Sequence, residues 1–443
     1  MTDRTAQATD VLQHLIRNAC VNDGASGSEA RNVEVLADVL DAPGLDLEVY
    51  EAAPGRANLV ARIEGSDPDA PSLLLSGHTD VVPADPMGWD RDPFGGELVD
   101  GFVWGRGAID MLNLTASMAV AVRALADGGF RPAGTLIFAG VADEEAGCAL
   151  GSEWLVEHHA DAVRADYVVT EFGGSRVGDD GLGVLVGVAE KGPFWITIDV
   201  DGTPGHGSRP YRTDNALVTA ARIVQRLADY ASPATVTDAW RQSVEGLALP
   251  AEITAGLLDP ARVDGTIAAL AVEDEELART VHACTHSTFA PTMLSSGVKT
   301  NVIPDRARIQ VDIRALPGHG PDQLLAFIDE ALGDLRGRID VTVEAMHDPS
   351  SSPADSPLRD TLERVTQRLV PGARTVPSIL AGFTDAFAYR SLGAVAYGYG
   401  LFSDRMPMDE VGQMFHGRNE RIDVDSLGLD VELWRQVATD LLT

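Results

Sequence analysis

Histidines and carboxylates that could bind metal ions occur at five separate places in this 443-residue sequence. The first is the end of an apolar run, where LLLSG passes directly into His78, Thr79 and Asp80. A zinc-binding imidazole needs its second ring nitrogen oriented, commonly by a nearby carboxylate. Because residues i and i+2 of an extended segment project to the same side, Asp80 could orient His78 without binding metal itself. A structural turn is the alternative explanation of so short a motif.

Acidic residues follow predicted strands, or precede a predicted helix, at three further places. Asp110 ends the glycine-rich stretch GRGAID, where glycines permit close backbone approach; the alternative is a helix-start residue stabilised by the helix dipole. Glu144 and Glu145 stand in VADEEAG, after a strand expected to be buried, where unpaired carboxylates are costly. Two such glutamates can divide the work of metal ligand and base, although acidic clusters are more often solvated turns. Glu171 ends YVVTE.

The fifth place is His416, in the stretch MFHGRNE near the C-terminus. Each motif alone is more often structural than functional. Together, the histidines and carboxylates suit two divalent ions bridged by one aspartate. Mixed imidazole and carboxylate ligation favours zinc, with cobalt or manganese as possible substitutes.

The elements that must position these residues are predicted from hydrophobic patterning. The first 190 residues alternate between short strands and helices, which favours a largely buried sheet covered on both faces. In such sheets, sites lie at strand ends. Strands are expected at 47–51, 58–63, 72–76, 135–140 and 167–170, and helices at 112–126 and 151–159.

A second unit is predicted to start near residue 191. Strands at 194–200, 306–313 and 339–345 and helices at 215–229 and 321–332 follow a ferredoxin-like order. The segment 233–292 interrupts this order with mostly helical sequence, such as 273–282. The segment 347–357, HDPSSSPADSP, resembles a linker, after which α/β character resumes through 358–369 and 394–399. We therefore expect one domain built from 1–190 and 349–443, with 191–348 inserted.

Composition excludes several classes of function. With 34 basic and 67 acidic residues the net charge is −33, which repels phosphate backbones, so no nucleic-acid partner is expected. No apolar run approaches the roughly 20 residues of a membrane span, and no signal peptide is recognised, which favours the cytoplasm. Cys20, Cys148 and Cys284 form no CxxC pair, so we expect neither a disulfide framework nor a thiolate metal site.

The whole sequence resembles the metallopeptidase family that contains carboxypeptidase G, the aminoacylases, succinyl-diaminopimelate desuccinylase and related dipeptidases. The matching stretches, in the family's order, are SGHTDVVP, the GW…PF…DG…WGRGAIDM block, ADEEAG, TEFGG, GTPGHGS, KTNVIPDRARIQVDIR and FHGRNERI. The resemblance implies a zinc-exopeptidase-like catalytic domain, with a mixed sheet between helices, and an inserted α+β ferredoxin-like lid or dimerisation domain.

The resemblance also implies a role for each metal-site residue. His78 and Glu171 would bind one zinc ion, Glu145 and His416 the other, and Asp110 would bridge the two. Asp80 would orient His78. Glu144 would be the general base that takes a proton from water and passes it to the leaving amine. A cis peptide is implied between Asp110 and Met111.

Residues of the inserted domain are expected to contact the substrate. His206, in GHGS, resembles a histidine that polarises the scissile carbonyl, often from the partner subunit of a homodimer; the alternative is a lid-loop histidine that makes a hydrogen bond. Asn301, in TNVIP, resembles a substrate-contacting amide. Arg314, in DIR, could contact substrate or form a structural ion pair.

Two positions depart from the family pattern. The segment GFTD, which includes Thr384 as an expected substrate-binding residue, carries Phe383 where the family usually has a second glycine, and this could reshape the pocket. Leu112 replaces a lysine that is not a ligand in the family, so some local charge contact must differ.

The sequence therefore predicts a hydrolase of an amide bond in a small substrate, such as a dipeptide or an N-acyl amino acid. The alternative is a catalytically silent binding or regulatory protein on the same fold. Loss of Glu144 or of a ligand would favour that alternative, and the sequence retains them all. A homodimer through the inserted domain is expected.

Overall fold

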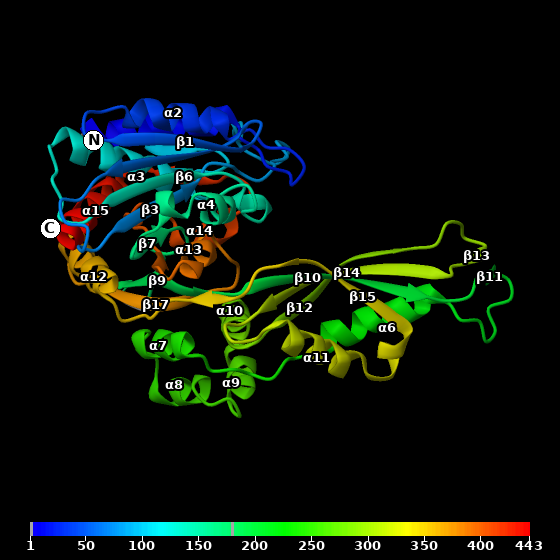
Figure 1. The fold of residues 1–443 in the computed structure, drawn as a ribbon. Helices are drawn as coiled ribbons and strands as arrows, with labels where there is room; N and C mark the ends of the chain where they lie inside the picture. Colours follow the sequence, from blue (N-terminus) through cyan, green and yellow to red (C-terminus); the bar gives the residue numbers. More distant parts are fainter. Residues whose placement is uncertain (1–2, 179–180) are drawn as a thin grey trace. The chain divides into compact units, whose positions relative to one another are not determined.

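The computed structural model describes residues 3–178 and 181–443, which divide between two compact units (Figure 1). The first unit comprises residues 1–188, 352–378 and 384–443. The second comprises residues 189–351 together with the short return 379–383, which sequence patterning does not indicate. None of the helices in the described ranges has the length and apolar content needed to cross a membrane.

The first unit contains a mixed sheet, two small ribbons and the helices that pack on them. Its strands are β1 (Asp46–Ala53), β2 (Arg56–Ile63), β3 (Leu73–His78), β4 (Glu97–Val99), β5 (Phe102–Trp104), β6 (Leu136–Val141), β7 (Tyr167–Thr170), β8 (Arg176–Val177), β9 (Gly183–Glu190), β17 (Arg374–Leu380), β18 (Val395–Gly398) and β19 (Arg421–Asp423). Its helices are α1 (Asp3–Asn18), α2 (Ala30–Leu40), α3 (Leu112–Asp127), η1 (Glu144–Ala146), α4 (Ser152–His158), α5 (Ala160–Val163), α12 (Pro357–Leu369), α13 (Ala386–Ser391), α14 (Met408–Met414) and α15 (Val424–Leu442).

The large sheet has the strand order β1-β2-β6-β3-β7-β18-β9, with β8 and β17 also paired to β9. Its centre is parallel: β3 pairs with β6 and β7, and β18 pairs with β7. The strands β1, β2 and β9 are antiparallel to their neighbours. The mixed α/β architecture predicted from the sequence is confirmed.

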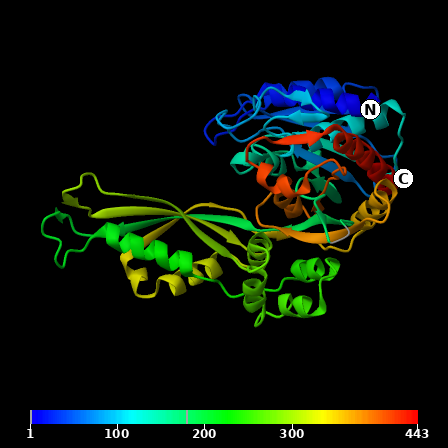
Figure 2. The same cartoon turned by 180° about the vertical axis from the view of Figure 1, so that it is seen from behind.

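Helices cover both faces of this sheet, because its central strands are apolar on both sides. All six residues of β3 are buried, and so are all six of β6. On one face Ser76 bonds Tyr389 of α13, whereas Gly77 packs against Thr115 of α3 on the other. The helices α1 and α15 pack with α3, and Figure 2 shows the red C-terminal helix α15 from behind.

The second unit contains the antiparallel sheet β12-β14-β10-β15, which has the ferredoxin-like strand order. Its strands are β10 (Gly192–Asp201), β11 (Gly205–His206), β12 (Thr288–Ser296), β13 (Val302–Ile303), β14 (Arg306–Ala315), β15 (Ile339–Met346) and β16 (Ser350–Ser351). Its helices are α6 (Ala216–Asp229), α7 (Asp238–Gly246), α8 (Ala251–Leu257), α9 (Val263–Leu270), α10 (Glu275–Thr285), α11 (Pro321–Leu332) and η2 (Gly333–Arg338).

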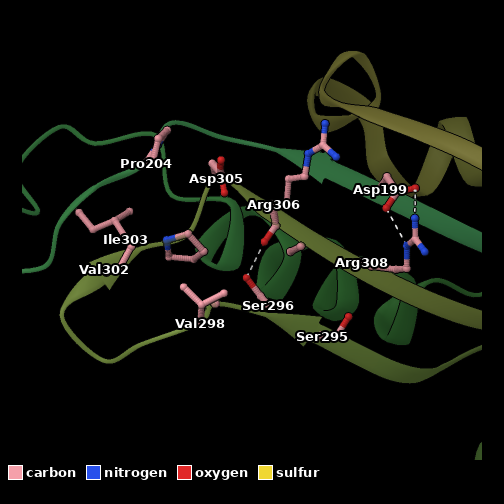
Figure 3. A pocket seen from close by; sticks show the side chains of 13 residues that line it. Asp199, Pro204, Ser295, Ser296, Val298, Val302, Ile303, Asp305, Arg306 and Arg308 are labelled. Carbon is pink, nitrogen blue, oxygen red and sulfur yellow. Dashed lines mark hydrogen bonds and ion pairs between the residues drawn. The ribbon is translucent and has the colours of Figure 1, made fainter.

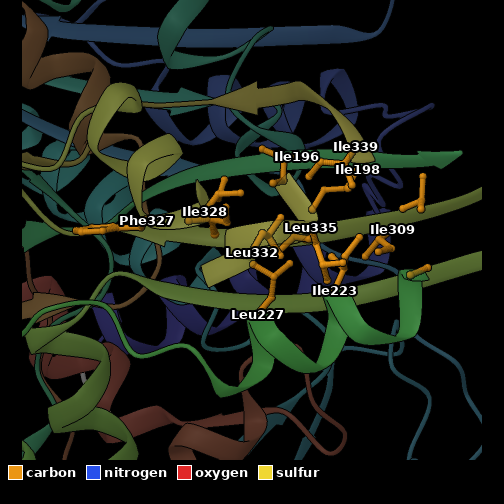
Figure 4. Close-up of a cluster of buried hydrophobic side chains, with 14 of the residues drawn as sticks. Ile196, Ile198, Ile223, Leu227, Ile309, Phe327, Ile328, Leu332, Leu335 and Ile339 are labelled. Atoms are coloured by element: carbon orange, nitrogen blue, oxygen red, sulfur yellow. The ribbon is translucent and has the colours of Figure 1, made fainter. Parts of the chain in front are cut away.

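A separate hydrophobic core holds this unit together (Figure 4). Ile196, Ile198 and Ile309 project from one face of the sheet toward Ile223 of α6 and Ile328 of α11. Each is buried, and burial of an aliphatic side chain contributes about 1.5–3 kcal/mol. The opposite face carries the alternate, polar residues of β14, as expected for a sheet covered on one side only.

At two places in this region the structure contains a strand that the sequence-based description does not name. The interrupting segment 233–292 contains the helices α7 to α10, as expected, but its last residues belong to strand β12. The expected linker 347–357 includes strand β16, which pairs with Glu190 and Ala189. In both places the residues are largely exposed or polar, so hydrophobic alternation does not mark the strand.

Candidate metal centre

The carboxyl ends of three parallel strands bring the predicted ligands together. Strand β3 ends at His78, β6 is followed by Glu144 and Glu145, and β7 is followed by Glu171. Because β6, β3 and β7 are parallel neighbours, these ends lie at one edge of the sheet.

The first cluster consists of His78, Asp110 and Glu171, whose ligand atoms lie within 4.8 Å of one another. Nε2 of His78 is 3.3 Å from Oδ1 of Asp110 and 3.6 Å from Oε2 of Glu171. All three residues are buried, and none is more than 3% exposed. One imidazole and two carboxylates facing a common point form a donor set that suits a divalent ion.

The second cluster consists of Asp110, Glu145 and His416. Nε2 of His416 is 3.2 Å from Oδ2 of Asp110 and 3.0 Å from Oε2 of Glu145. The two oxygens of Asp110 thus face different histidines, Oδ1 toward His78 and Oδ2 toward His416. Asp110 is shared by both clusters, which is the arrangement of a bridging carboxylate.

The charge balance of the clusters fits bound cations. Among the described residues, both carboxylate oxygens of Glu171 and Oε1 of Glu145 are buried without a hydrogen-bond partner. Burial, and the charge of neighbouring carboxylates, raise the pKa of Glu171 and of Glu145 above the ordinary value. Burial opposes ionisation of Asp110 too, but the neighbouring imidazoles of His416 and His78 hold its pKa well below the usual range. Such crowded, unpartnered carboxylates are what a divalent ion stabilises.

Glu144 stands beside the clusters without belonging to either of them. Its Oε2 is 3.9 Å from Nε2 of His78, and the residue is 7% exposed. Burial and the nearby carboxylate of Glu171 raise the pKa of Glu144 well above its ordinary value. A buried carboxyl with a raised pKa next to a metal centre is suited to accept and return a proton.

His78 is oriented by the main chain of Asp80 more closely than by its carboxylate. Nδ1 of His78 is 2.9 Å from the Asp80 carbonyl oxygen and 3.6 Å from its Oδ1. A carbonyl can only accept, so Nδ1 carries the proton and Nε2 is left free to face the first cluster. The carboxylate of Asp80 instead accepts hydrogen bonds from Asn22 and from the main-chain N–H of Glu145.

The loop that carries Asp110 is held by a residue that sequence reasoning did not single out, Glu420. Its carboxylate accepts hydrogen bonds from the main-chain N–H groups of Gly107, Ile109 and Asp110 and from Arg106. Glu420 is fully buried. The only available signal was its place in the family-like stretch FHGRNERI. The loop also contains the expected cis peptide between Asp110 and Met111.

Leu112, the departure from the family pattern, is buried at the first position of α3. A Cβ added at Gly107 would lie 2.6 Å from its Cδ1 and 2.7 Å from a methyl of Val81. The leucine side chain therefore packs in apolar surroundings beside Gly107. The ammonium group of a lysine at this position would have to lie outside those surroundings.

Thr384 also lies in the first unit, two residues before the start of α13. Its Oγ1 accepts a hydrogen bond from the main-chain N–H of Ala386 at 3.1 Å, so it shapes the start of that helix. It is 3% exposed. Its expected contact with substrate stays a prediction.

His206 and Asn301 lie in the second unit, on the small ribbon of β11 and β13. His206 pairs with Val302, and Gly207 donates a main-chain hydrogen bond to the Asn301 carbonyl. The main-chain N–H of Ser208 donates to Nδ1 of His206 at 3.2 Å. In the neutral ring Nδ1 therefore accepts, and Nε2 carries the proton.

An open cavity of about 450 Å³ lies next to this ribbon (Figure 3). Val302, Ile303 and Pro304 line one side, and the ion pair between Arg308 and Asp199, at 2.9 Å, lies at another. It contains none of the residues of the two clusters.

Arg314, also in the second unit, forms the ion pair that was one of its two expected roles. Its Nε is 2.8 Å from Oδ1 of Asp312, and its guanidinium lies 5.8 Å from the ring centroids of Trp195 and Phe383. Phe383 thus packs beside a paired arginine. Contact of Arg314 with substrate stays a prediction.

Comparison with known proteins agrees with this geometry. Residues 74–440 match the profile of Peptidase family M20/M25/M40. The N-fatty-acyl-amino acid synthase/hydrolase PM20D1 of Xenopus tropicalis is 27% identical over 396 residues, which cover 88% of this chain and 76% of the relative. The succinyl-diaminopimelate desuccinylase of Paracoccus denitrificans is 26% identical over 410 residues, which cover 90% of this chain and 93% of the relative.

Solved structures share the fold. The M20 family metallo-carboxypeptidase Sso-CP2 from Sulfolobus solfataricus superposes with a TM-score of 0.76 at 18% identity, over 99% of this chain and 98% of that one. Human carnosine dipeptidase 1 gives 0.66 at 16% identity, over 98% and 97%. The sequence match spans most of the chain, so the protein belongs to Peptidase family M20/M25/M40 and is a metal-dependent peptidase or amidohydrolase of that family.

Proposed function

We propose that this protein hydrolyses the amide bond of a small substrate, an N-acyl amino acid or a dipeptide, with two zinc ions as cofactor. His78 and Glu171 would hold one ion, Glu145 and His416 the other, and Asp110 both. The observation that carries this proposal is the shared, buried Asp110, whose two oxygens face a buried His78 on one side and a partly exposed His416 on the other. Cobalt or manganese could substitute for zinc.

Two bound divalent ions would polarise the substrate carbonyl and make water acidic enough to lose a proton near neutral pH. The protein's own part is to move that proton. Glu144 would accept it on a carboxylate oxygen and then donate it to the nitrogen of the leaving amine. Its burial supports this role, because a carboxyl shielded from bulk water exchanges protons with the reacting atoms and not with solvent.

His206 would donate a hydrogen bond from its Nε2–H to the oxygen of the scissile carbonyl as negative charge develops there. The hydrogen bond from the Ser208 main chain to Nδ1 supports this direction of donation. Mixing an inactive Glu144 variant with an inactive His206 variant tests where this donor comes from. It belongs either to the same subunit or to the partner of a homodimer. Recovered activity in the mixture means that the donor acts across subunits.

The substrate class rests on the sequence relatives. Both are named for reactions of N-acyl amino acids, so amides of acylated amino acids come first in the proposal and dipeptides second. The test uses protein stripped with a chelator and reloaded with zinc, cobalt or manganese, against a panel of N-acyl amino acids and dipeptides. We expect hydrolysis that disappears on chelation and returns with metal.

The variant Glu144→Gln is expected to bind both ions and to lose about 100- to 10,000-fold in kcat, the usual contribution of a general base. Glu157→Gln, the same change at an exposed position of α4, is the control and should leave kcat unchanged. Two bound metals without turnover across the panel would contradict the proposal and favour a silent binding protein. A homodimer and a cytoplasmic location stay predictions.

A further inference from the structure

A buried network of polar side chains reaches the metal-site residues from strand β2 and the loop before α2. Arg56 donates from Nε and from one terminal nitrogen to the two oxygens of Glu29, at 2.6 and 2.7 Å. The same terminal nitrogen donates to Oδ1 of Asp143 at 2.7 Å. Arg56 is 9% exposed, Asp143 5% and Glu29 0%. None of the three belongs to a metal-binding cluster.

Asn22 links this ion pair to Asp80. Its amide nitrogen is 2.9 Å from Oδ2 of Asp80 and 2.9 Å from Oδ1 of Asp143. An amide nitrogen has two hydrogens, so it can donate one to each carboxylate. The amide oxygen accepts from the main-chain N–H of Gly24 at 3.0 Å. If the amide group were flipped, its oxygen would instead lie between the carboxylates of Asp80 and Asp143.

The network ends on the atoms that fix the proposed ligands and base. Oδ2 of Asp80 accepts the main-chain N–H of Glu145 at 3.2 Å, and the Asp80 carbonyl accepts Nδ1 of His78. Asp143 precedes Glu144 and adopts φ 67°, a conformation that non-glycine residues rarely take without support. Its Oδ2 accepts from the main-chain N–H of Leu150 at 3.0 Å. Both His78 and the turn with Glu144 and Glu145 are therefore tied to the same buried groups.

The charges of this network lead us to expect that it is sensitive to substitution. Glu29, Asp143 and Asp80 are buried carboxylates, and Arg56 is the arginine that pairs with two of them. A planar guanidinium can satisfy both oxygens of one carboxylate and still reach another, which a lysine ammonium does less well. Space is also tight, since a Cβ added at Gly27 would lie 2.5 Å from Cζ of Arg56.

We propose that Arg56 and Asn22 are positioning residues, which set the direction of His78 and of the Glu144–Glu145 turn through Asp80 and Asp143. The part of this inference that concerns turnover rests on the proposed hydrolase function. The part that concerns metal affinity does not. Neither residue belongs to either of the two metal-binding clusters.

The test measures metal binding by competition with a coloured chelator, the absorption spectrum of the cobalt-loaded protein, and kcat and KM separately. We expect Asn22→Ala and Arg56→Met each to weaken metal binding about 10- to 100-fold, the usual effect of losing a partner of a metal ligand. The cobalt spectrum should change, kcat should fall by a similar factor, and KM should stay within about twofold. Arg56→Lys should recover part of the loss.

Two further variants and a control separate the positioning role from an effect on general stability. In the double variant Asn22→Ala with Arg56→Met, the loss of metal affinity should be smaller than the product of the single losses, because both act through Asp143. Gly27→Ala removes no polar group, yet it should reproduce the Arg56 effect by displacing the guanidinium. Arg123→Met, which removes an ion pair with Asp127 within α3 and hydrogen bonds to the main chain of Val39 and Asp41, is the control and should leave metal affinity unchanged.

The outcomes distinguish this proposal from the proposed function. Variants that melt earlier but bind metal and turn over like the unaltered protein would overturn the positioning role. If the unaltered protein binds two metals and hydrolyses nothing, the proposed function fails, and the difference in metal affinity between variants still decides the role of Arg56 and Asn22.

Discussion

The aspartates Asp80 and Asp110 both lie beside His78, and their surroundings give them different tasks. Asp110 faces two imidazoles, which stabilise its ionised form and suit it to the proposed role of shared ligand. Burial raises the pKa of Asp80, and its carboxylate bonds N–H groups of Asn22 and Glu145 instead of a metal cluster. Although both are aspartates beside His78, their different hydrogen-bond donors suit Asp110 to be a metal ligand and Asp80 to be a support.

A buried lysine in the second unit predicts how stability changes with pH. Lys191 is 0% exposed, and its Nζ lies within hydrogen-bond distance of the carbonyls of Ala283 and His286 and of the Thr288 hydroxyl, which can donate to the neutral amine. Burial lowers the pKa of Lys191 from 10.5 to about 7. Between these pH values the unfolded chain holds a proton that the folded chain lacks, so the free energy of unfolding rises with pH by up to about 1.4 kcal/mol per unit.

The comparison with Lys191→Met isolates this effect. Methionine removes these three hydrogen-bonded contacts at every pH, which lowers stability by a constant amount, and it cannot titrate. Urea unfolding at pH 7, 8 and 9 should therefore give a difference between the two proteins that grows with pH in favour of lysine. A difference that stays constant would mean that Lys191 remains protonated in the folded state.

At the scale of elements, the packing of β18 against the end of β7 fixes Glu171. Gly398 of β18 is the parallel partner of Thr170, and a Cβ there would lie 2.0 Å from the main-chain oxygen of Glu171. A main-chain oxygen cannot rotate away from such a contact as a side chain can, so Gly398→Ala should displace the end of the strand. We expect a loss of about 1–3 kcal/mol in stability and a fall from two bound metals toward one.

Gly265→Ala is the matched control for this substitution. Gly265 lies in α9, where an added Cβ would meet no atom within 4 Å. Alanine should stabilise that helix by about 0.5–1 kcal/mol and leave metal binding unchanged. Two bound metals in folded Gly398→Ala would show that Glu171 tolerates the shift or does not bind metal.

The central elements could be predicted because their residues are buried in a regular pattern. Strand β7 and helix α11 have the predicted bounds, and β3, β6 and α3 differ by one or two residues. Strands β12 and β16 were missed because their exposed residues do not alternate. In an edge strand, pairing is set by the neighbouring strand and leaves little trace in composition.

The residues of the metal site also differ in whether a local sequence pattern reveals them. His78, Glu145 and Glu171 follow apolar strands, so the sequence places them at one sheet edge. Arg56 and Glu420 act through partners 87 and 314 positions away in the chain, and no local pattern marks such a contact. Residues that support a ligand are therefore harder to predict than the ligand.

At the scale of the whole molecule, the two units have separate cores and separate shares of the proposed chemistry. The five proposed ligands and Glu144 belong to the first unit, whereas His206, Asn301 and Arg314 belong to the second. The apolar cluster of the second unit contains only its own residues. Metal binding should consequently act on the stability of one unit more than the other.

Hydrogen exchange read by mass spectrometry tests this division. A ligand that binds only the folded state stabilises it by RT ln(1 + [L]/Kd), about 2.7 kcal/mol when its concentration is 100 times Kd. With zinc, amides of β3, β6 and β7 should exchange up to about 100-fold more slowly, whereas those of β10 and β14 should change little. The variant Glu171→Gln should reduce the protection. Equal protection of both units would mean that they unfold together, and the metal would then stabilise a single cooperative fold.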